Sequence, residues 1–384
     1  MDDLTTGKID IDAVTRTGPG TLAGRYMRRF WQPVAMADEI ETGKARTLKI
    51  MSEEFTLYRG KSGRAYAVGH RCAHRETQLS VGMVIDDCIR CLYHGWKYDG
   101  DGNCVDQPAE TNQNFARKVH IRSYPVVEYI GLVFVYMGEG EAPPPPRFAE
   151  FEGDGLLYPT TYTRLCNYYQ NIENACDPTH LPFTHIKTFD ALNFDVPTVA
   201  AEETAYGLIQ FGTRGKDRVR AQHILMPNLF SSVLPSPEPQ IKEWPLSLAW
   251  RVPVDDETHK TLQVYFHPGT PLDPRAFQER RRQRMEELAV LRPSNEIAAD
   301  ILANKIGLYD PDIMERPDYV NIQDHVAQMG QGAITNRARE RLGVGDTAII
   351  LLRKLWLRDL AALDAGREPK QWRYPAGLDR RKGT

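Results

Sequence analysis

Two cysteines and two histidines of this 384-residue chain stand in two short groups, Cys72-Ala73-His74 and Cys91-Leu92-Tyr93-His94, with sixteen residues between them. Thiolates and imidazoles are transition-metal ligands, and two such loops can hold one metal centre. A [2Fe–2S] cluster in which two histidines replace two cysteines on one iron takes two ligands of each kind. The neutral imidazoles raise the potential of such a cluster above that of an all-cysteine one, so it suits electron delivery at modest potential.

The alternative for this region is a zinc site. Cys88, Cys91 and Cys104 could join the histidines in a tetrahedral Cys/His shell. Each group here pairs one cysteine with one histidine, however, whereas zinc modules typically pair cysteine with cysteine and histidine with histidine. We therefore favour the iron–sulfur cluster and expect Cys88 and Cys104 to have packing roles.

A second group of candidate ligands is Asp177, His180 and His185. Two neutral imidazoles and one carboxylate on one face of Fe(II) leave open positions for oxygen and substrate. A five-residue step along an unbroken helix turns by roughly 500°, which would point the two imidazoles apart. Pro182 lies between them and breaks that regularity. We expect the helix to end or bend near Pro178, so that both histidines converge from a turn, with Asp177 as a ligand or as a hydrogen-bond acceptor for an imidazole.

The elements around the first group are predicted to be short strands. Phe55, Leu57, Tyr58, Tyr66 and Val68 with Gly60 and Gly63 between them indicate a hairpin within residues 48–68, and strands continue to Tyr136. Pro143 to Pro146 can continue neither a strand nor a helix, and they mark a boundary near Phe148. We therefore predict an all-β N-terminal domain over residues 1–147 and a second domain over residues 148–384.

The second domain is predicted to be of the α+β class, an antiparallel sheet flanked by helices. Alternation in Leu246, Leu248, Trp250 and Val252, within a strand-rich region over 205–266, indicates antiparallel strands with one face on a core. Apolar residues at helical spacing predict helices, at residues 164–175, 277–291, 320–342 and 347–363. Strands followed by helices argue against a doubly wound sheet.

Composition narrows the possible partners. The formal net charge is −3, with 41% hydrophobic and 26% charged residues, so nothing attracts the whole chain to nucleic acid or to an anionic membrane. The longest aliphatic run, Ala348 to Leu352, is far shorter than the roughly 20 residues that span a bilayer. The first residues are acidic and lack the apolar run of an export signal. Six cysteines then suit a reducing compartment, and we expect a cytoplasmic protein without membrane or nucleic-acid partners.

The two cysteine–histidine groups carry a family resemblance. Arg71-Cys72-Ala73-His74 and Cys91-Leu92-Tyr93-His94-Gly95-Trp96 resemble the cluster loops of Rieske non-haem iron ring-hydroxylating oxygenases. The segments from Arg28 to Ala35 and from Asn103 to Pro108 resemble the phthalate-dioxygenase-like group of that family. The resemblance implies a Rieske [2Fe–2S] domain with Cys72, His74, Cys91 and His94 as its ligands, in the terminal oxygenase (alpha) subunit.

The resemblance also implies a mononuclear iron site and an assembly. His180 and His185 would be iron ligands, and Asp324 in the segment from Asn321 to Gln328 would supply the carboxylate, with Asp310, Asp312 and Asp318 as competitors. The corresponding family aspartate links an iron-ligand histidine to a cluster histidine of a neighbouring subunit. Asp177 would thus connect His180 to His94 or His74 across an interface, which implies an oligomer, usually a homotrimer.

The activity implied is the use of O₂ to hydroxylate an aromatic substrate, with aromatic catabolism as its setting. Gly18-Pro19-Gly20 lacks a complete nucleotide motif, so the electrons would come from a separate NAD(P)H-dependent reductase, with or without a ferredoxin. We favour cis-dihydroxylation. The same ligands serve mono-oxygenases that hydroxylate or that demethylate aromatic ethers or amines, and this alternative stays open. Asn167, Gln170, Glu173 and Asn174 could line the approach to iron.

Overall fold

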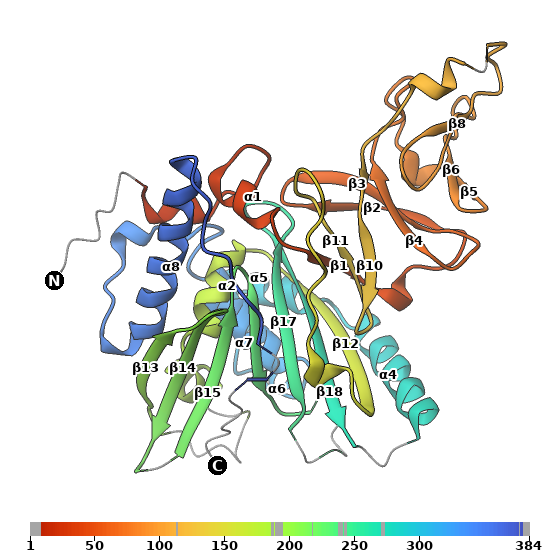
Figure 1. Ribbon diagram of the computed structural model, residues 1–384. Helices are drawn as coiled ribbons and strands as arrows, with labels where there is room; N and C mark the ends of the chain where they lie inside the picture. Colours follow the sequence, from red (N-terminus) through yellow and green to blue (C-terminus); the bar gives the residue numbers. More distant parts are fainter. Residues whose placement is uncertain are drawn as a thin grey trace. The chain divides into compact units, whose positions relative to one another are not determined.

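The computed structural model describes residues 9–112, 114–185, 188, 195–216, 218–236, 241, 244–269, 273–375 and 377–378. It divides the chain into two compact units (Figure 1). One unit is Thr17–Pro146, and the other is the chain from Arg147 onward, joined by the described residues 9–16. The second unit holds this N-terminal segment because the Tyr168 hydroxyl donates to the Val14 carbonyl at 2.7 Å and the Asn167 amide donates to the Thr15 carbonyl at 2.8 Å. The sequence analysis had placed the segment with the N-terminal domain.

Short antiparallel strands in three sheets make up the Thr17–Pro146 unit (Figure 1). A single α-helix, α1 (Leu22–Met27), precedes them and is capped by Thr21. The sheets have the strand orders β1 (Gln32–Met36)–β11 (Leu132–Val135)–β10 (Val126–Tyr129), β2 (Ala45–Ile50)–β3 (Glu53–Arg59)–β4 (Ala65–Gly69)–β9 (Ser123–Tyr124) and β5 (Met83–Ile85)–β6 (Cys88–Arg90)–β7 (Lys97–Tyr98)–β8 (Cys104–Asp106). The hairpin expected within residues 48–68 is formed by β3 and β4.

A seven-stranded antiparallel sheet is the centre of the larger unit. Its strands lie in the order β12 (Gly155–Arg164), β18 (His259–Pro268), β17 (Leu246–Pro253), β16 (Leu229–Val233), β15 (Arg218–Leu225), β14 (Gly207–Arg214) and β13 (Thr198–Glu203). The antiparallel strands of the α+β prediction are thus present. β17 is buried on both faces along nearly its whole length, however, so the polar positions of its alternation do not meet solvent as expected.

Helices pack on this sheet and on one another (Figure 1). α2 packs on β17, α7 packs on α2, α3 and α5, α4 packs on β12, and α8 packs on β13 and β14. Their bounds are α2 (Tyr168–Ala175), α3 (Leu181–Thr184), α4 (Pro274–Ala289), α5 (Ser294–Leu302), α6 (Pro311–Met314), α7 (Tyr319–Met329) and α8 (Thr347–Asp364). Among the described residues, no helix is long and apolar enough to cross a membrane.

Two predicted helices have different ends in the structure. Arg164 ends β12, and α2 begins only after Asn167, whose side chain caps it. α7 ends at Met329, far short of the predicted Leu342, because two glycines follow and Gly332 has a φ of +96°, which other residues rarely adopt. The apolar spacing that suggested a longer helix could not reveal this stop.

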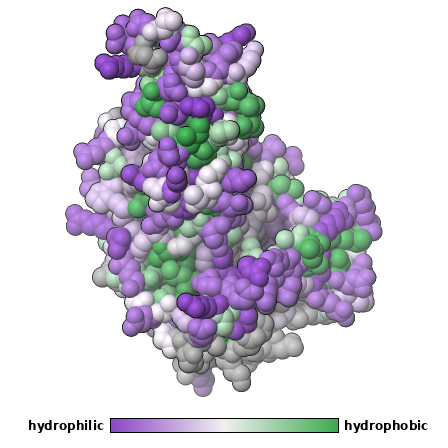
Figure 2. Space-filling model, turned by 90° about the vertical axis from the view of Figure 1, so that its right-hand side faces the viewer, coloured by the Kyte–Doolittle hydropathy of each residue, from purple (hydrophilic) through white to green (hydrophobic). Residues whose placement is uncertain are grey.

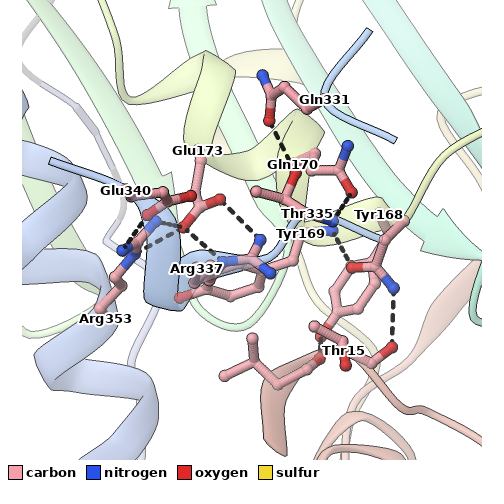
Figure 3. A network of polar contacts seen from close by, with 12 residues as sticks. Thr15, Tyr168, Tyr169, Gln170, Glu173, Gln331, Thr335, Arg337, Glu340 and Arg353 are labelled. Carbon is pink, nitrogen blue, oxygen red and sulfur yellow. Dashed lines mark hydrogen bonds and ion pairs between the residues drawn. The ribbon is translucent and has the colours of Figure 1, made fainter. Parts of the chain in front are cut away.

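A buried ion-pair network joins α2 to the chain that follows α7 (Figure 3). Glu173 of α2 accepts from Arg337 at 2.8 Å and from Arg353 of α8 at 2.7 Å. Arg353 also pairs with Glu340 at 2.8 Å. The Arg337 side chain is fully buried and that of Glu173 is 9% exposed, so these charges depend on one another rather than on water.

Gln170 makes the second connection of α2 in the same region (Figure 3). Its amide nitrogen donates to the carbonyls of Gln328 and Gly332, each at 3.0 Å, and its carbonyl accepts from the Thr335 backbone at 3.1 Å. The Gln328 carbonyl at the end of α7 thus accepts from this side chain in addition to the Gln331 backbone N–H. Glu173 and Gln170 together fix α7 beside α2.

We predict that Glu173→Ala lowers the free energy of unfolding by about 3–5 kcal/mol, because it leaves two arginines in the interior without their carboxylate. Urea denaturation followed by circular dichroism measures the change. The control is Glu279→Ala, which breaks an exposed pair with Arg282 and should cost less than about 1 kcal/mol. Equal effects of the two variants would contradict a structural role for Glu173.

Candidate metal centres

The two cysteine–histidine groups lie in loops of the same backbone geometry. The first loop, from Cys72 to Thr77, is closed by hydrogen bonds from Cys72 N to Thr77 O at 2.9 Å and from Glu76 N to Cys72 O at 3.0 Å. The second loop runs from Cys91 to Trp96 between β6 and β7 and has the matching pair of bonds, at 2.8 and 3.1 Å. The fifth residue of each loop has a positive φ, 60° at Glu76 and 74° at Gly95. Each loop thus presents a cysteine at its start and a histidine near its tip.

The four side chains divide into a buried pair and an outer pair. Cys72 and Cys91 are buried, whereas His74 is exposed and His94 is half-buried. The rings of His74 and His94 have centroids 4.5 Å apart, and the His74 ring stacks on Trp96 at 4.6 Å with an interplanar angle of 11°. Trp96 itself is buried, so it fixes the plane of an otherwise exposed ligand.

This arrangement fits a two-iron cluster better than a zinc ion. A tetrahedral zinc shell needs four ligand atoms around one point. The described residues include only one group of three or more His, Cys, Asp or Glu whose ligand atoms could share one ion, and it does not involve these four. Cys104 is packed in the hydrophobic core of the unit, and Cys88 is half-buried at the start of β6. A buried thiol pair and an outer imidazole pair correspond to the two different irons of a histidine-containing [2Fe–2S] cluster.

Tyr98, which the sequence analysis did not select, contacts the first loop. Its hydroxyl lies 3.2 Å from the Cys72 sulfur and accepts a hydrogen bond from the Ala73 backbone at 3.2 Å. Because the oxygen accepts from Ala73, its own hydrogen is available to the sulfur. Burial first, and then the Cys72 sulfur, raise the pKa of Tyr98, so the phenol remains protonated. Tyr98 is thus a hydrogen-bond donor to a candidate cluster ligand.

The second group is positioned by a break between two helices. α2 ends at Ala175, and the four-residue helix α3 begins after His180 and ends before His185, with Pro182 in its first turn. The two histidines therefore flank one short turn, as the position of Pro182 suggests. Their ring centroids are 5.6 Å apart at an interplanar angle of 71°.

Asp324 of α7 completes this group. The ligand atoms of His180, His185 and Asp324 all lie within 4.8 Å of one another. Asp324 Oδ1 is 3.5 Å from His185 Nε2 and 4.0 Å from His180 Nε2. The same oxygen is buried without a hydrogen bond of good geometry, as expected of an atom whose partner is a metal ion. Burial would raise the pKa of Asp324, but the contact with His185 and the charge of Arg164 hold it below its usual value.

The competing aspartates have other partners. Asp310 accepts from the Gly307 backbone at 2.7 Å, and Asp318 pairs with Arg316 at 2.9 Å. Asp312, in the first turn of α6, does not belong to the group of three. Of the four candidate aspartates, only Asp324 lies with the two histidines.

Two neighbours orient these candidate ligands. His185 Nδ1 is 2.9 Å from the Gln323 side-chain oxygen, which also accepts from Thr188 at 2.9 Å. This bond places the proton on Nδ1, and Nε2 faces Asp324. His180 Nδ1 faces the backbone oxygen of Asp177, and an Asp177 carboxylate oxygen lies 3.9 Å away. Asp177 is therefore next to His180 but outside the group of three.

Most of the residues expected to line the approach to iron instead form hydrogen bonds or ion pairs with other parts of the unit. Asn167 donates to the carbonyls of Thr15 and Asp256, while Gln170 and Glu173 hold the network described above. These three residues hold α2 in place. Asn174, the fourth residue expected along the approach, takes no part in these contacts. His325, which follows Asp324, has a structural role. It is fully buried and accepts from Arg164 Nε at 3.1 Å.

Comparison with known proteins agrees with both centres. Residues 30–125 match the family described as the Rieske [2Fe-2S] domain. The phenoxybenzoate dioxygenase subunit alpha of Ectopseudomonas oleovorans is 31% identical over 376 residues, which cover 91% of this chain and 84% of that protein. The 5,5'-dehydrodivanillate O-demethylase oxygenase subunit of a Sphingobium species is 29% identical over 94% of this chain and 81% of that protein.

The fold has solved counterparts. The oxygenase of a carbazole 1,9a-dioxygenase, determined in complex with its ferredoxin, aligns with a TM-score of 0.62. The alignment covers 96% of this chain and 95% of that chain at 22% identity. The likeness therefore extends over both units and is not limited to the cluster loops.

We predict that Tyr98→Phe lowers the reduction potential of the cluster, because hydrogen bonds to the sulfurs stabilise the more negative reduced state. A shift of about 60 mV, the equivalent of a tenfold change for one electron, is expected. A redox titration followed by EPR measures it. The control is Tyr124→Phe, whose hydroxyl donates to Glu53 and not to a sulfur. An unchanged potential in Tyr98→Phe would show that the hydroxyl has no electronic role.

The relationship to the dioxygenase subunit holds over nearly the whole chain, and the donor sets of both centres fit the metals of such subunits. A [2Fe–2S] cluster and a mononuclear iron are accordingly its cofactors. The chain belongs to the Rieske non-haem iron oxygenases, as a terminal oxygenase subunit.

Proposed function

We propose that this subunit uses O₂ and electrons from a separate NAD(P)H-dependent reductase to hydroxylate an aromatic substrate by cis-dihydroxylation. Cys72, His74, Cys91 and His94 bind the cluster, and His180, His185 and Asp324 bind the iron. The observation that carries the proposal is the group of three ligand atoms within 4.8 Å, in the same chain as the cluster loops. An electron carrier has no use for a second site of this kind.

The iron supplies redox chemistry toward O₂ when it is bound, and the cluster supplies single electrons. The chain's own residues set the geometry. His180, His185 and Asp324 would hold the ion through two imidazoles and one carboxylate, a donor set that leaves coordination positions for O₂ and substrate. Gln323 fixes the orientation of His185, and α3 fixes the separation of the two histidines. The candidate ligands are therefore positioned by the chain itself.

An external electron donor is supported by the surface around the cluster loops. His74 is exposed and its ring contacts that of His94, and the residues that precede His94, Leu92 and Tyr93, are 71% and 57% exposed. Figure 2 shows that hydrophobic groups occur among the mostly polar surface residues of the face that it draws. Apolar residues around an exposed ligand suit a transient protein contact. The oxygenase–ferredoxin complex of the carbazole system supports a ferredoxin as one such donor.

Asp177 is proposed to connect the two kinds of centre between subunits, in a homotrimer. It lies beside His180, and its side chain is 24% exposed, so one carboxylate oxygen can accept a second hydrogen bond. The acceptor role would link His180 to His94 or His74 of a neighbouring copy. A carboxylate between two imidazoles offers a hydrogen-bonded route for an electron and a proton.

Oxidative demethylation is the second candidate, because the 5,5'-dehydrodivanillate O-demethylase subunit is related over 94% of this chain. Both candidates need the same ligands and the same electron supply. They differ in where the two oxygen atoms of O₂ end, since demethylation places one in the formaldehyde that it releases and the other in water, whereas cis-dihydroxylation places both in the product. The names of the two curated relatives describe carboxylated arenes, which makes this class the first to test.

Product analysis under ¹⁸O₂ separates the candidates. We expect a cis-diol with two labelled oxygens from the reconstituted system of oxygenase, reductase and NAD(P)H. His180→Ala should abolish product and lower the iron content while the EPR signal of the cluster is kept, which ties the product to the mononuclear site. Formaldehyde, or a product with one labelled oxygen, would replace the main proposal with the second one.

We predict that Asp177→Asn keeps the cluster signal and the iron content but reduces turnover by at least about 100-fold, since the amide cannot serve as a charged acceptor for both imidazoles. Single-turnover oxidation of the reduced cluster measures the step directly. Thr179→Ala is the control, because it removes only a hydroxyl that donates to the Asp177 carboxylate. Cluster oxidation at the wild-type rate in Asp177→Asn would exclude the bridge.

A further inference from the structure

One face of the large sheet carries polar side chains into the interior near Asp324. Opposite residues of antiparallel strands share a face. Thr261 of β18 is opposite both Tyr162 of β12 and Arg251 of β17, and in the next row His259 is opposite Arg164. All five therefore share a face, and the amide of Asn171 in α2 covers it by bonding to His259 and Thr261.

Two guanidinium groups on this face have unused donors. Arg164 is fully buried, and its Nη1 and Nη2 have no hydrogen-bond partner. Arg251 is 8% exposed, and its Nε and Nη1 are likewise unpaired. Neither forms an ion pair with a carboxylate in the described part of the chain. Unpaired buried donors of a charged group cost several kcal/mol each, so this pattern indicates a missing partner.

The position of the pair relates it to the iron site. Arg164 Nε donates to His325, the residue after Asp324, at 3.1 Å. Arg251 and Arg164 both interact electrostatically with Asp324. The two guanidinium groups thus share one carboxylate, Asp324, which also faces His180 and His185. The missing partner is therefore an anion.

The charges of the two arginines also act on the hydroxyl of Tyr162, on the same face of the sheet. Burial would raise the pKa of Tyr162, but Arg251 and then Arg164 outweigh this effect and lower it. The Arg164 guanidinium lies 5.1 Å from the Tyr162 ring centroid. The Tyr162 hydroxyl is thus a good hydrogen-bond donor toward an anion held by the two arginines.

We propose that Arg251 and Arg164 bind a carboxylate group of the aromatic substrate, beside the His180–His185–Asp324 site. A planar carboxylate can accept two parallel bonds from a guanidinium, and the two unpaired terminal nitrogens of Arg164 offer such a fork. The inference rests on the proposed aromatic-oxygenase function and adds the substrate class to it. Arg251, which retains some accessible surface, is the specificity-determining residue.

The test compares acids with their primary amides, which have nearly the same shape but no charge. Benzoate, 4-methoxybenzoate, phthalate and 3-phenoxybenzoate are titrated by calorimetry into the full-length holoprotein in a buffer free of phosphate and carboxylate. At least one acid should bind 10- to 100-fold more tightly than its amide, the range expected for charge-assisted hydrogen bonds. Arg251→Gln should remove this preference and leave amide binding within about threefold. A wild-type protein without preference for any acid overturns the proposal.

Two further variants serve as controls. Arg251→Lys keeps the charge without the fork and should retain part of the preference. Arg281→Gln removes another buried guanidinium, on α4, which donates to the Pro159 carbonyl, and it should leave the ratio of acid to amide unchanged. A loss of the ratio in Arg281→Gln equal to that in Arg251→Gln would mean that buried arginines act only on folding, and the proposal would fail.

Failure of this inference can be told apart from failure of the proposed function. Binding is measured without turnover, so the preference for acids is tested even if no arene is oxidised. Oxygen uptake that neither acids nor amides stimulate would contradict the proposed function alone. Oxygen uptake stimulated equally by an acid and its amide, with equal binding, would contradict only the carboxylate site.

Discussion

The buried carboxylate of Glu173 is the contact on which the mononuclear site depends. His180 and His185 follow α2, whereas Asp324 belongs to α7, far along the chain, and nothing local keeps these segments together. Glu173 lies in the interior and pairs with both Arg337 and Arg353, and a buried carboxylate that lost these partners would be strongly destabilising. The chain after α7 must therefore return to α2, and Gln170 holds the end of α7 in the same place. The geometry of the three candidate iron ligands thus depends on ion pairs that involve none of them.

In the cluster unit, the candidate ligands are brought together by local contacts. Its four candidate ligands come from two loops of six residues, and each loop is closed by its own pair of backbone hydrogen bonds. A positive φ at Glu76 and Gly95 turns both loops in the same way. Little of the surrounding sheet is needed to define the ligand positions, and the strands nearby are only two or three residues long. Trp96 and Tyr98 then add the contacts that orient His74 and Cys72.

This difference explains what the sequence could predict. Candidate ligands in short loops are visible as spacing, so the four candidate cluster ligands and the pair His180 and His185 could be proposed from the chain itself. Asp324 required a family resemblance, because no local pattern relates it to the histidines. Asn167, Gln170 and Glu173 were misinterpreted as approach-lining residues, since polar side chains next to ligands look alike whether they face a substrate or a neighbouring helix. No sequence motif points to Gln323 or Tyr98, and only the fold shows which atoms they contact.

Polar residues on the large sheet were equally ambiguous in sequence, because their spacing does not show whether they face water or the interior. Alternation in β17 predicted an apolar face on the core and a polar face in water, which is the usual meaning of a period of two. Here the second face is also covered, so Ser247, Arg251 and the facing Gln263 are buried. A serine and a glutamine can satisfy each other, as these two do at 2.7 Å. A guanidinium has five donors and no acceptor, and it cannot be satisfied by such neighbours alone. The unpaired donors of Arg164 and Arg251 distinguish them from Ser247 and Gln263 on this covered face, and they are the reason for proposing a negatively charged ligand that supplies the missing acceptors.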